Sequence, residues 1–311
     1  MFELIKPNTN IDFFKLRPYA FSLSGFLTVV GIVALIYRGG PNYGIDFAGG
    51  IMLHVAVDPS VSISDVRGAV DKLGLGDRGA SVQEFGNQPG EYLLRVATAD
   101  DKLAGGEAES IKKSLAGAFA DKNFRDLRTE VVGPRVGKDL RERAVLSVLF
   151  ATLMMGIYIA FRFDMRFGIG AAVALFHDVM VAVSALAIFN MEVDLTIVAA
   201  LLTIVGYSVN DTVIVSDRIR ENQHRYQKEG IRTLINRSIN ETLSRTILTS
   251  STTLMVCAAL YMFGGGVIHG FAFTLLVGIV TGTYSSIFIA SPIVEMWKGG
   301  GTTLGADKAK A

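Results

Sequence analysis

Ionisable side chains inside long apolar stretches are the feature of this sequence that points most directly to chemistry. Asp211 lies 16 residues after Leu195 in one such stretch, within the polar run 206–212, and Arg245 begins the next stretch. An acid inside a membrane span is energetically unfavourable and usually faces a partner or a water-filled path. We therefore interpret Asp211, with its neighbour Asn210, as a candidate ion-coupling site.

Asp211 and Arg245 are expected at similar depth in a membrane. At roughly 1.5 Å per residue, Asp211 lies about 24 Å along its helix from Leu195, between the midplane and the cytoplasmic face, and the next span runs back from that face. The two side chains either pair, which keeps the acid ionised until a proton arrives, or Arg245 extends its stem to the inner surface. The alternative for Asp211 is an acid satisfied by neighbouring hydroxyls and amides.

A second polar pair, His177 and Asp178, lies in the middle of another apolar stretch. A histidine beside an acid either relays protons near neutral pH or forms hydrogen bonds between helices. The hydroxyl run 249–253 is predicted to bond back to the carbonyls of its own helix. Gly278 and Gly282 allow a neighbouring helix to approach closely.

The elements that position these residues are six apolar blocks. The chain is 50% hydrophobic and 19% charged, with a net charge of +1, whereas soluble domains are about 25% charged. Each block is near the length of about 20 residues that crosses a bilayer. The first is too long for a secretory signal and is predicted to be an uncleaved helix. The blocks are Pro18–Tyr37, Ala144–Phe161, Phe167–Phe189, Leu195–Val215, Thr246–Phe263 and Phe271–Val294.

The short loops predict the orientation of these helices. Lysine and arginine gather before the first block, after the second and fourth blocks, and in the tail. Basic short loops stay in the cytoplasm, so both termini are predicted to be cytoplasmic and the long insert to lie on the outer side. Apolar residues at helical spacing over 231–243 predict a helix that either lies at the membrane surface or packs on its neighbours.

The insert between the first two blocks is predicted to be a folded domain. Strands at 51–57, 80–85, 91–97 and 129–132 alternate with helices beginning at Ile63 and Glu107, and a turn covers 86–90. Ser62 and Asp65 are placed to form a capping box. The order β-α-β-β-α-β is that of a ferredoxin-like sandwich. The predicted divisions of the chain are 1–41, 42–137, 138–297 and 298–311.

No catalytic, metal or nucleic-acid site is predicted in this domain. Its one histidine, His54, has no ligand cluster around it, and acids outnumber bases, which disfavours nucleic acid. Its glycines lack the spacing of a dinucleotide site. The single cysteine of the chain, Cys257, lies in an apolar block. We therefore predict a binding or mechanical domain in a protein that is not an enzyme and uses no cofactor.

Several motif segments follow one another along the chain. They are 44–50, 132–137, 176–178, 207–222 and 244–246, and the positions that carry them include Gly44, Asp46, Phe47, Gly49, Gly50, Gly133, Pro134, Asp217 and Arg218. In this order they resemble the motifs of the SecF family, and the layout resembles half of a resistance-nodulation-division transporter. The resemblance runs from about residue 1 to residue 297.

This resemblance implies a function. SecF proteins act with SecD, and often YajC, beside the SecYEG channel in the lipid of the bacterial inner membrane. They promote late stages of preprotein translocation with energy from a proton or sodium gradient. Asp211 and Arg245 would then couple ion passage to movement, and the insert would be a periplasmic domain.

Two other functions remain open from the sequence. One is a small-molecule or lipid exporter subunit of the same architecture, which an exporter phenotype on deletion, with normal protein secretion, would favour. The other is a scaffold subunit in which the buried charges only specify helix pairing. That alternative predicts that exchanging the charges of Asp211 and Arg245 preserves function.

Overall fold

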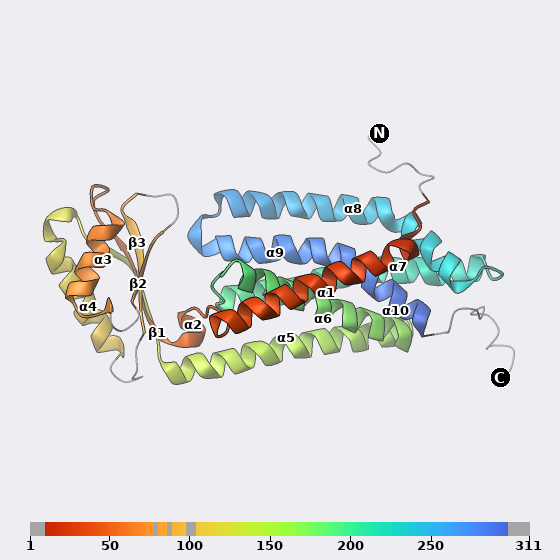
Figure 1. Cartoon of the computed structure of the whole chain (residues 1–311), viewed down its shortest axis with the longest axis horizontal. Coiled ribbons are helices and arrows are strands. Elements are labelled where there is room, and N and C mark those ends of the chain that lie inside the picture. Colours follow the sequence, from red (N-terminus) through yellow and green to blue (C-terminus); the bar gives the residue numbers. More distant parts are fainter. Residues whose placement is uncertain (1–9, 77–79, 86–88, 98–103, 298–311) are drawn as a thin grey trace.

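The protein consists of a bundle of long helices with a small α/β domain at one end (Figure 1). The structure is a computed structural model that describes residues 10–76, 80–85, 89–97 and 104–297. Within these ranges six helices are long and apolar enough to cross a membrane. The six predicted transmembrane helices are therefore confirmed.

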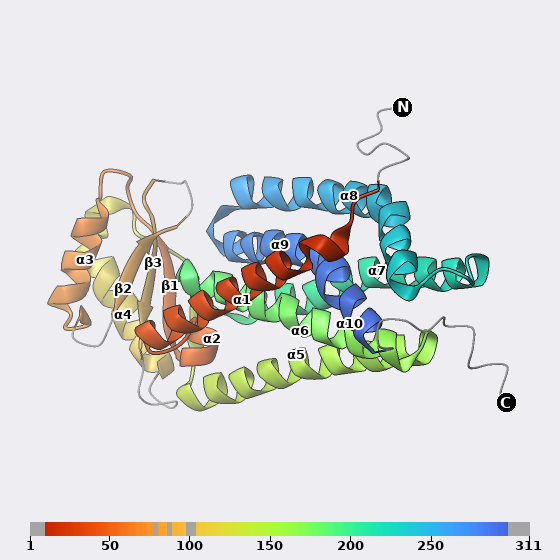
Figure 2. The same cartoon turned by 45° about the vertical axis from the view of Figure 1, so that its right-hand side comes forward.

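The spans run antiparallel along the long axis of the bundle. The fourth and fifth extend well beyond the other helices on the side opposite the small domain (Figures 1 and 2). The last span contains a π-helical turn, η3. The bounds are α1 (Phe13–Arg38), α5 (Pro134–Arg162), α6 (Met165–Ile188), α7 (Leu195–Arg225), α8 (Ile231–Phe263) and α9 (Gly265–Ser285), followed by η3 (Ser286–Ala290) and α10 (Ser291–Met296).

The first part of α8 packs against neighbouring helices. Ile231, Leu234, Ile235 and Ile239 are all buried, and they join a core cluster with Phe13 at the start of α1. Of the two alternatives for residues 231–243, this burial supports the helix packed on its neighbours. This helix begins earlier in the sequence than the predicted start at Thr246, since α8 continues without a break from Ile231.

Close approach between α7 and α9 depends on two glycines of α9. A Cβ added at Gly278 would lie 2.2 Å from Ile204 Cδ1, and one at Gly282 would lie 2.9 Å from Ser208 Cβ. Any larger side chain would push the two helices apart. The close helix approach predicted from the spacing of these glycines is confirmed.

The small domain contains one antiparallel sheet with strand order β2-β3-β1-β4. Its elements follow in the predicted order, although β4 begins earlier than predicted. Residues 86–88 of the predicted turn lie outside the described residues. The bounds are α2 (Ile45–Ala48), β1 (Gly50–Ala56), α3 (Ile63–Lys72), β2 (Ser81–Glu84), β3 (Glu91–Val96), α4 (Ala104–Ala118), η2 (Ala120–Lys122) and β4 (Arg125–Val132).

The two faces of this sheet have different neighbours. Ile51 and Leu53 point to α3 and α4 and are fully buried with them, because alternate residues of a strand face opposite sides. Met52 and His54 point to the other face, which is turned toward the helix bundle (Figure 2). The predicted capping box of Ser62 and Asp65 is present at the start of α3.

The small domain joins the bundle through a pair of glycines. Gly49 has a φ of 77°, and a Cβ there would lie 2.8 Å from Pro134 Cα at the start of α5. Gly50 has a φ of 146°, and a Cβ there would lie 2.7 Å from the Val96 carbonyl oxygen. Only glycine satisfies both the positive φ and the close approach, so this segment brings α5, β1 and β3 together.

Candidate functional site

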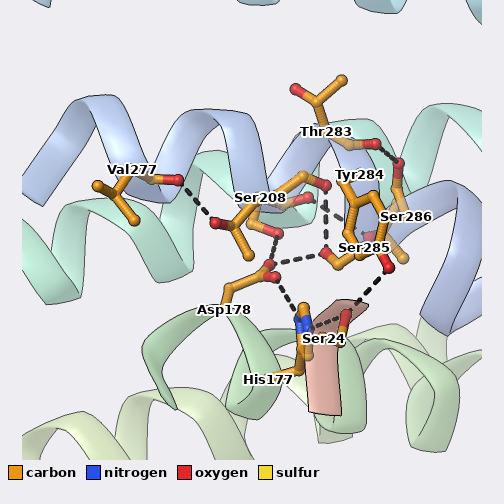
Figure 3. Close-up of polar contacts among 12 residues, drawn as sticks. Ser24, His177, Asp178, Ser208, Val277, Thr283, Tyr284, Ser285 and Ser286 are labelled. Carbon is orange, nitrogen blue, oxygen red and sulfur yellow. Dashed lines mark hydrogen bonds and ion pairs between the residues drawn. The ribbon is translucent and has the colours of Figure 1, made fainter. Parts of the chain in front are cut away.

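Asp178 is the centre of a fully satisfied hydrogen-bond network inside the bundle. Its side chain on α6 is 0% exposed. Ser208 Oγ of α7 donates to Asp178 Oδ2 at 2.6 Å, and Ser285 Oγ of α9 donates to the same oxygen at 2.8 Å. His177 Nδ1 lies 3.1 Å from Asp178 Oδ1. Three helices therefore meet at one carboxyl group (Figure 3).

The network continues from His177 to the first helix. His177 Nε2 lies 2.9 Å from Ser24 Oγ on α1, and Ser24 Oγ lies 3.0 Å from the hydroxyl of Tyr284 on α9. The Tyr284 hydroxyl donates in turn to the Ala20 carbonyl of α1. The contacts of His177 thus tie α1, which has few other buried residues, to the centre of the bundle.

Asp211 is buried to nearly the same degree but is held much more loosely. Its side chain is 2% exposed. Ser250 Oγ of α8 and Thr283 Oγ1 of α9 both lie 3.5 Å from Asp211 Oδ2, at the outer limit of a hydrogen bond. These two hydroxyls lie only 2.6 Å from each other. Because one of their hydrogens is used between them, the carboxyl group of Asp211 is only weakly partnered.

Arg245 and Asn210 lie apart from this acid. Both side chains are exposed on the bundle surface. Across the described part of the chain, Arg245 forms no ion pair within 4.0 Å, although its charge still attracts that of Asp211. The structure therefore does not bring Asp211 and Arg245 into the direct pair that the sequence offered as one alternative. The other alternative, an arginine extended toward the surface, agrees with this exposure.

The hydroxyl groups of residues 249–253 on α8 form two kinds of contact. Thr249, Thr252 and Thr253 all donate to carbonyls one turn earlier in their own helix, as predicted. Ser250 differs from them, since its hydroxyl contacts Thr283 and faces Asp211. One member of the run therefore belongs to the surroundings of the candidate site.

The end of α7 that lies next to the small domain is connected to it by main-chain hydrogen bonds. The Gly44 amide donates to the Val193 carbonyl at 2.9 Å, and the Val193 amide donates to the Asn42 carbonyl at 2.7 Å. Asp46 Oδ2 accepts a hydrogen bond of 3.0 Å from the Leu195 amide, at the first residue of α7. The motif residues Gly44 and Asp46 therefore hold the start of the helix that carries Asp211.

An ion pair completes this connection, which we call the outer joint (residues 42–50, 190–195 and Arg95). Arg95 of β3 pairs with Glu192 in the loop between α6 and α7. Burial raises the pKa of Glu192 despite this arginine, and the charges of Asp194 and Asp46 raise it further. Burial raises the pKa of Asp194 as well. The joint therefore places three acids and one arginine in close proximity.

A cleft of about 580 Å³ lies beside the outer joint, between the open face of the sheet and the bundle.

The remaining motif residues lie elsewhere. Phe47 is buried beside Gly137 of α5, and Gly133 precedes Pro134 at the start of α5. On the side of the bundle opposite the small domain, Asp217 is exposed and Arg218 pairs with Glu221. Among the described residues there is no group of three His, Cys, Asp or Glu side chains that could hold a metal ion.

Comparison with known families agrees with this architecture. A family described as "Protein export membrane protein SecD/SecF, C-terminal" matches residues 111–300, and the "SecD/SecF GG Motif" matches residues 36–61, which include Gly49 and Gly50. The chain belongs to the SecD/SecF family. It is a multi-pass membrane protein, and the resemblance noted in the sequence is confirmed.

Individual SecF proteins match along almost their whole length. The chain is 44% identical to the protein translocase subunit SecF of Desulfurispirillum indicum over 293 residues, covering 93% of this chain and 92% of that protein. It is 40% identical to the SecF of Vibrio alginolyticus, covering 94% of this chain and 91% of that protein.

The fold resembles SecDF in crystal structures. SecDF of Thermus thermophilus matches with a TM-score of 0.81 and 35% identity, over 95% of this chain and 40% of the SecDF chain. A structure of SecDF in a super-membrane-facing form matches with a TM-score of 0.66, 35% identity and 96% of this chain, again over 40% of that chain. This chain thus corresponds to less than half of SecDF.

Several residues of the site were not identified from the sequence. Ser24 lies in an apolar block with no signal that marks it, and Tyr284 and Ser285 were not singled out. The dense hydroxyl run 281–286 is the one signal that could have identified the α9 partners of both acids. The ion pair of Arg95 with Glu192 joins residues far apart in sequence, so no local pattern predicts it.

Proposed function

We propose that this protein is a SecF-type subunit of the Sec protein translocase that uses an ion gradient to promote preprotein translocation. It acts with SecD, beside SecYEG and YajC, in the bacterial inner membrane. Both termini lie in the cytoplasm, and the small domain, which we assign to the ferredoxin-like class from its strand order, lies in the periplasm. Membership of the SecD/SecF family supports the translocase role.

The main support for the proposed ion coupling is that the carboxyl group of Asp211 is buried but only weakly hydrogen-bonded. Its two partners lie at 3.5 Å and bond to each other more closely than to the acid. Protonation of this buried acid therefore removes a charge without breaking any strong hydrogen bond. Each elementary charge that crosses 100 mV supplies about 2.3 kcal/mol, which is enough to shift a two-state equilibrium severalfold.

The outer joint supports a route from this charge to the periplasmic side. Asp211 lies on α7, and the first residue of α7 is held by Asp46 next to the ion pair of Arg95 with Glu192. A shift of α7 against α8 and α9 is therefore passed to the small domain without an intervening flexible loop. The two SecDF structures match this chain at the same identity with TM-scores of 0.81 and 0.66, and this difference supports a fold with more than one arrangement.

The test is translocation of a preprotein into inverted membrane vesicles with and without an ion gradient. Asp211→Asn is expected to abolish the gradient-dependent part of translocation while leaving expression and association with SecD unchanged. Asp139→Asn, a matched change at an exposed acid near the start of α5, is expected to behave as wild type. Normal gradient-dependent stimulation in Asp211→Asn would reject ion coupling and leave a scaffold subunit.

A further inference from the structure

Four hydrogen-bonding groups form an unbroken chain from Asp178 to the main chain of α1. In order they are the carboxyl of Asp178, the ring of His177, the hydroxyl of Ser24 and the hydroxyl of Tyr284, with contacts of 3.1, 2.9 and 3.0 Å. The chain ends at the Ala20 carbonyl. Each contact needs one hydrogen, so the number of hydrogens in the chain is fixed by its donors and acceptors.

The direction of each hydrogen bond follows from the carbonyl at the end. A carbonyl only accepts, so the single hydrogen of the Tyr284 hydroxyl points to Ala20. The Ser24 hydroxyl must then donate to Tyr284, and His177 Nε2 must carry a hydrogen and donate to Ser24. This assignment gives every contact one hydrogen and leaves none with two.

The remaining contact then holds an additional proton. With Nε2–H used toward Ser24, a neutral His177 would turn a bare Nδ1 toward Asp178, and an ionised Asp178 would offer only lone pairs in return. The contact is satisfied either by an imidazolium facing a carboxylate or by a neutral imidazole accepting from a protonated carboxyl. Both forms contain one proton more than neutral histidine with ionised aspartate.

We propose that His177 and Asp178 form a proton-binding site whose loaded form is held by the Tyr284 hydroxyl. When the pair passes its proton to water, Nδ1–H donates to the carboxylate and Nε2 becomes an acceptor. The Ser24 hydroxyl then turns from Tyr284 to His177, and the contact between Ser24 and Tyr284 loses its hydrogen. Release of one proton changes the charge of the pair from 0 to −1 and weakens the attachment of α1 to α9.

The surroundings isolate this pair from other charges. The groups that reach it are Ser24 from α1, Ser208 from α7, and Tyr284 with Ser285 from α9. Of these only Tyr284 is titratable. On α7, Asp211 lies about one turn beyond Ser208.

Helices α5 and α10 also pack on α6. The charged residues of α5 lie near its ends, in the range 135–143 and at Arg162, away from its middle. Glu295 of α10 is paired with Arg17. Within the described part of the chain, hydroxyl groups and no ion partner other than the pair itself therefore control the proton, and the site is independent of the role proposed for Asp211.

The test is a pH titration of His177 by nitrogen-15 solid-state NMR in lipid vesicles. The four histidines of the chain are labelled, and His177→Gln identifies the signal. We expect the His177–Asp178 pair to hold its additional proton at pH 7, seen either as an imidazolium signal or as a carboxyl signal of protonated Asp178. A neutral ring with its only proton on Nδ1, next to an ionised Asp178 at pH 7, would overturn the proposal.

A conservative variant separates this site from a purely structural network. Tyr284→Phe removes the hydroxyl that accepts a hydrogen bond from Ser24 in the protonated form, so release of the proton no longer breaks this bond. Loss of one such bond should weaken the proton affinity of the pair about threefold to tenfold, and the titration midpoint then moves to lower pH. Tyr158→Phe, at an exposed tyrosine of α5, is the matched control and is expected to leave the midpoint unchanged. An unchanged midpoint in Tyr284→Phe would contradict the proposal. Asp211→Asn is expected to leave the titration midpoint of the pair unchanged.

Discussion

The acids of α6 and α7 are equally hidden from solvent, yet the protein holds them in different ways. Asp178 is 0% exposed and has partners at 2.6, 2.8 and 3.1 Å, whereas Asp211 is 2% exposed and has partners only at 3.5 Å. Burial alone therefore does not separate the two acids. The distance to the partners does, because a change of charge at Asp178 must rearrange its hydrogen-bond partners, whereas a change of charge at Asp211 breaks no strong hydrogen bond.

The largest expected difference between the two acids concerns stability. Asp178→Ala leaves two serine hydroxyls and His177 without their partner, so we expect the free energy of unfolding to fall by roughly 3–5 kcal/mol. Asp211→Ala removes only weak contacts, and we expect a change below about 1 kcal/mol. Unfolding in detergent micelles, followed by helical circular dichroism, measures both. Equal losses in the two variants would remove the distinction.

A smaller effect is expected from pushing α9 away from α7 beside Ser208. Gly282→Ala places a Cβ 2.9 Å from that of Ser208, a partner of Asp178, and should lower the free energy of unfolding by about 1–3 kcal/mol. Gly206→Ala on α7 meets nothing within 4 Å, so the same change should be neutral or stabilising by up to about 1 kcal/mol. The same unfolding measurement applies, and a loss in Gly206→Ala as large as in Gly282→Ala would show that close packing is not the cause.

The smallest effect concerns the outer joint and its dependence on pH. The pKa values of Glu192 and Asp194 are raised in the folded protein, so the native joint binds protons more tightly than the unfolded chain. The resulting stabilisation is fully present below the ordinary carboxyl pKa, near 4, and is lost as the pH rises through the higher native values. The joint should therefore be tighter at mildly acidic pH than at neutral pH.

Hydrogen exchange of the Gly44 and Val193 amides, corrected for the intrinsic effect of pH, measures this opening. Glu192→Gln is expected to reduce the pH dependence, because its side chain no longer titrates. Glu109→Gln, at an exposed acid of α4, serves as the control. An opening equilibrium that tightens toward neutral pH would contradict the raised pKa values.

The sequence predicted the spans and the polar residues inside them better than it predicted their contacts. Apolar length identified all six helices, and glycine spacing indicated that α9 approaches a neighbour closely. The helix of 231–243 was ambiguous because an amphipathic pattern fits both a membrane surface and a protein interior. Only the packing of Ile235 and Ile239 against α1 and its neighbours decides between these environments.

In the candidate site, too, the sequence predicted the polar residues better than it predicted their contacts. Asp211, Asp178 and His177 are recognisable because ionisable residues are rare in apolar blocks. Their partners Ser24 and Tyr284 are ordinary residues for a membrane helix, and their roles depend on which faces of α1 and α9 meet. Similar depth along neighbouring helices did not place Arg245 within ion-pair distance of Asp211, since depth fixes only one coordinate of a side chain.

The most direct test of the central claim is access of water to the two acids during translocation. Thr283 faces Asp211 and Ser285 faces Asp178, two residues apart on α9. Each is replaced by cysteine in a Cys257→Ser background, because the native cysteine is the only other thiol. A water-soluble thiol reagent acts on the ionised thiol, which needs water around it. We predict that membrane vesicles engaged in translocation under an ion gradient show much faster modification of Thr283→Cys than of Ser285→Cys. Equal protection of both thiols, in resting and translocating vesicles alike, would contradict an ion-exchanging Asp211.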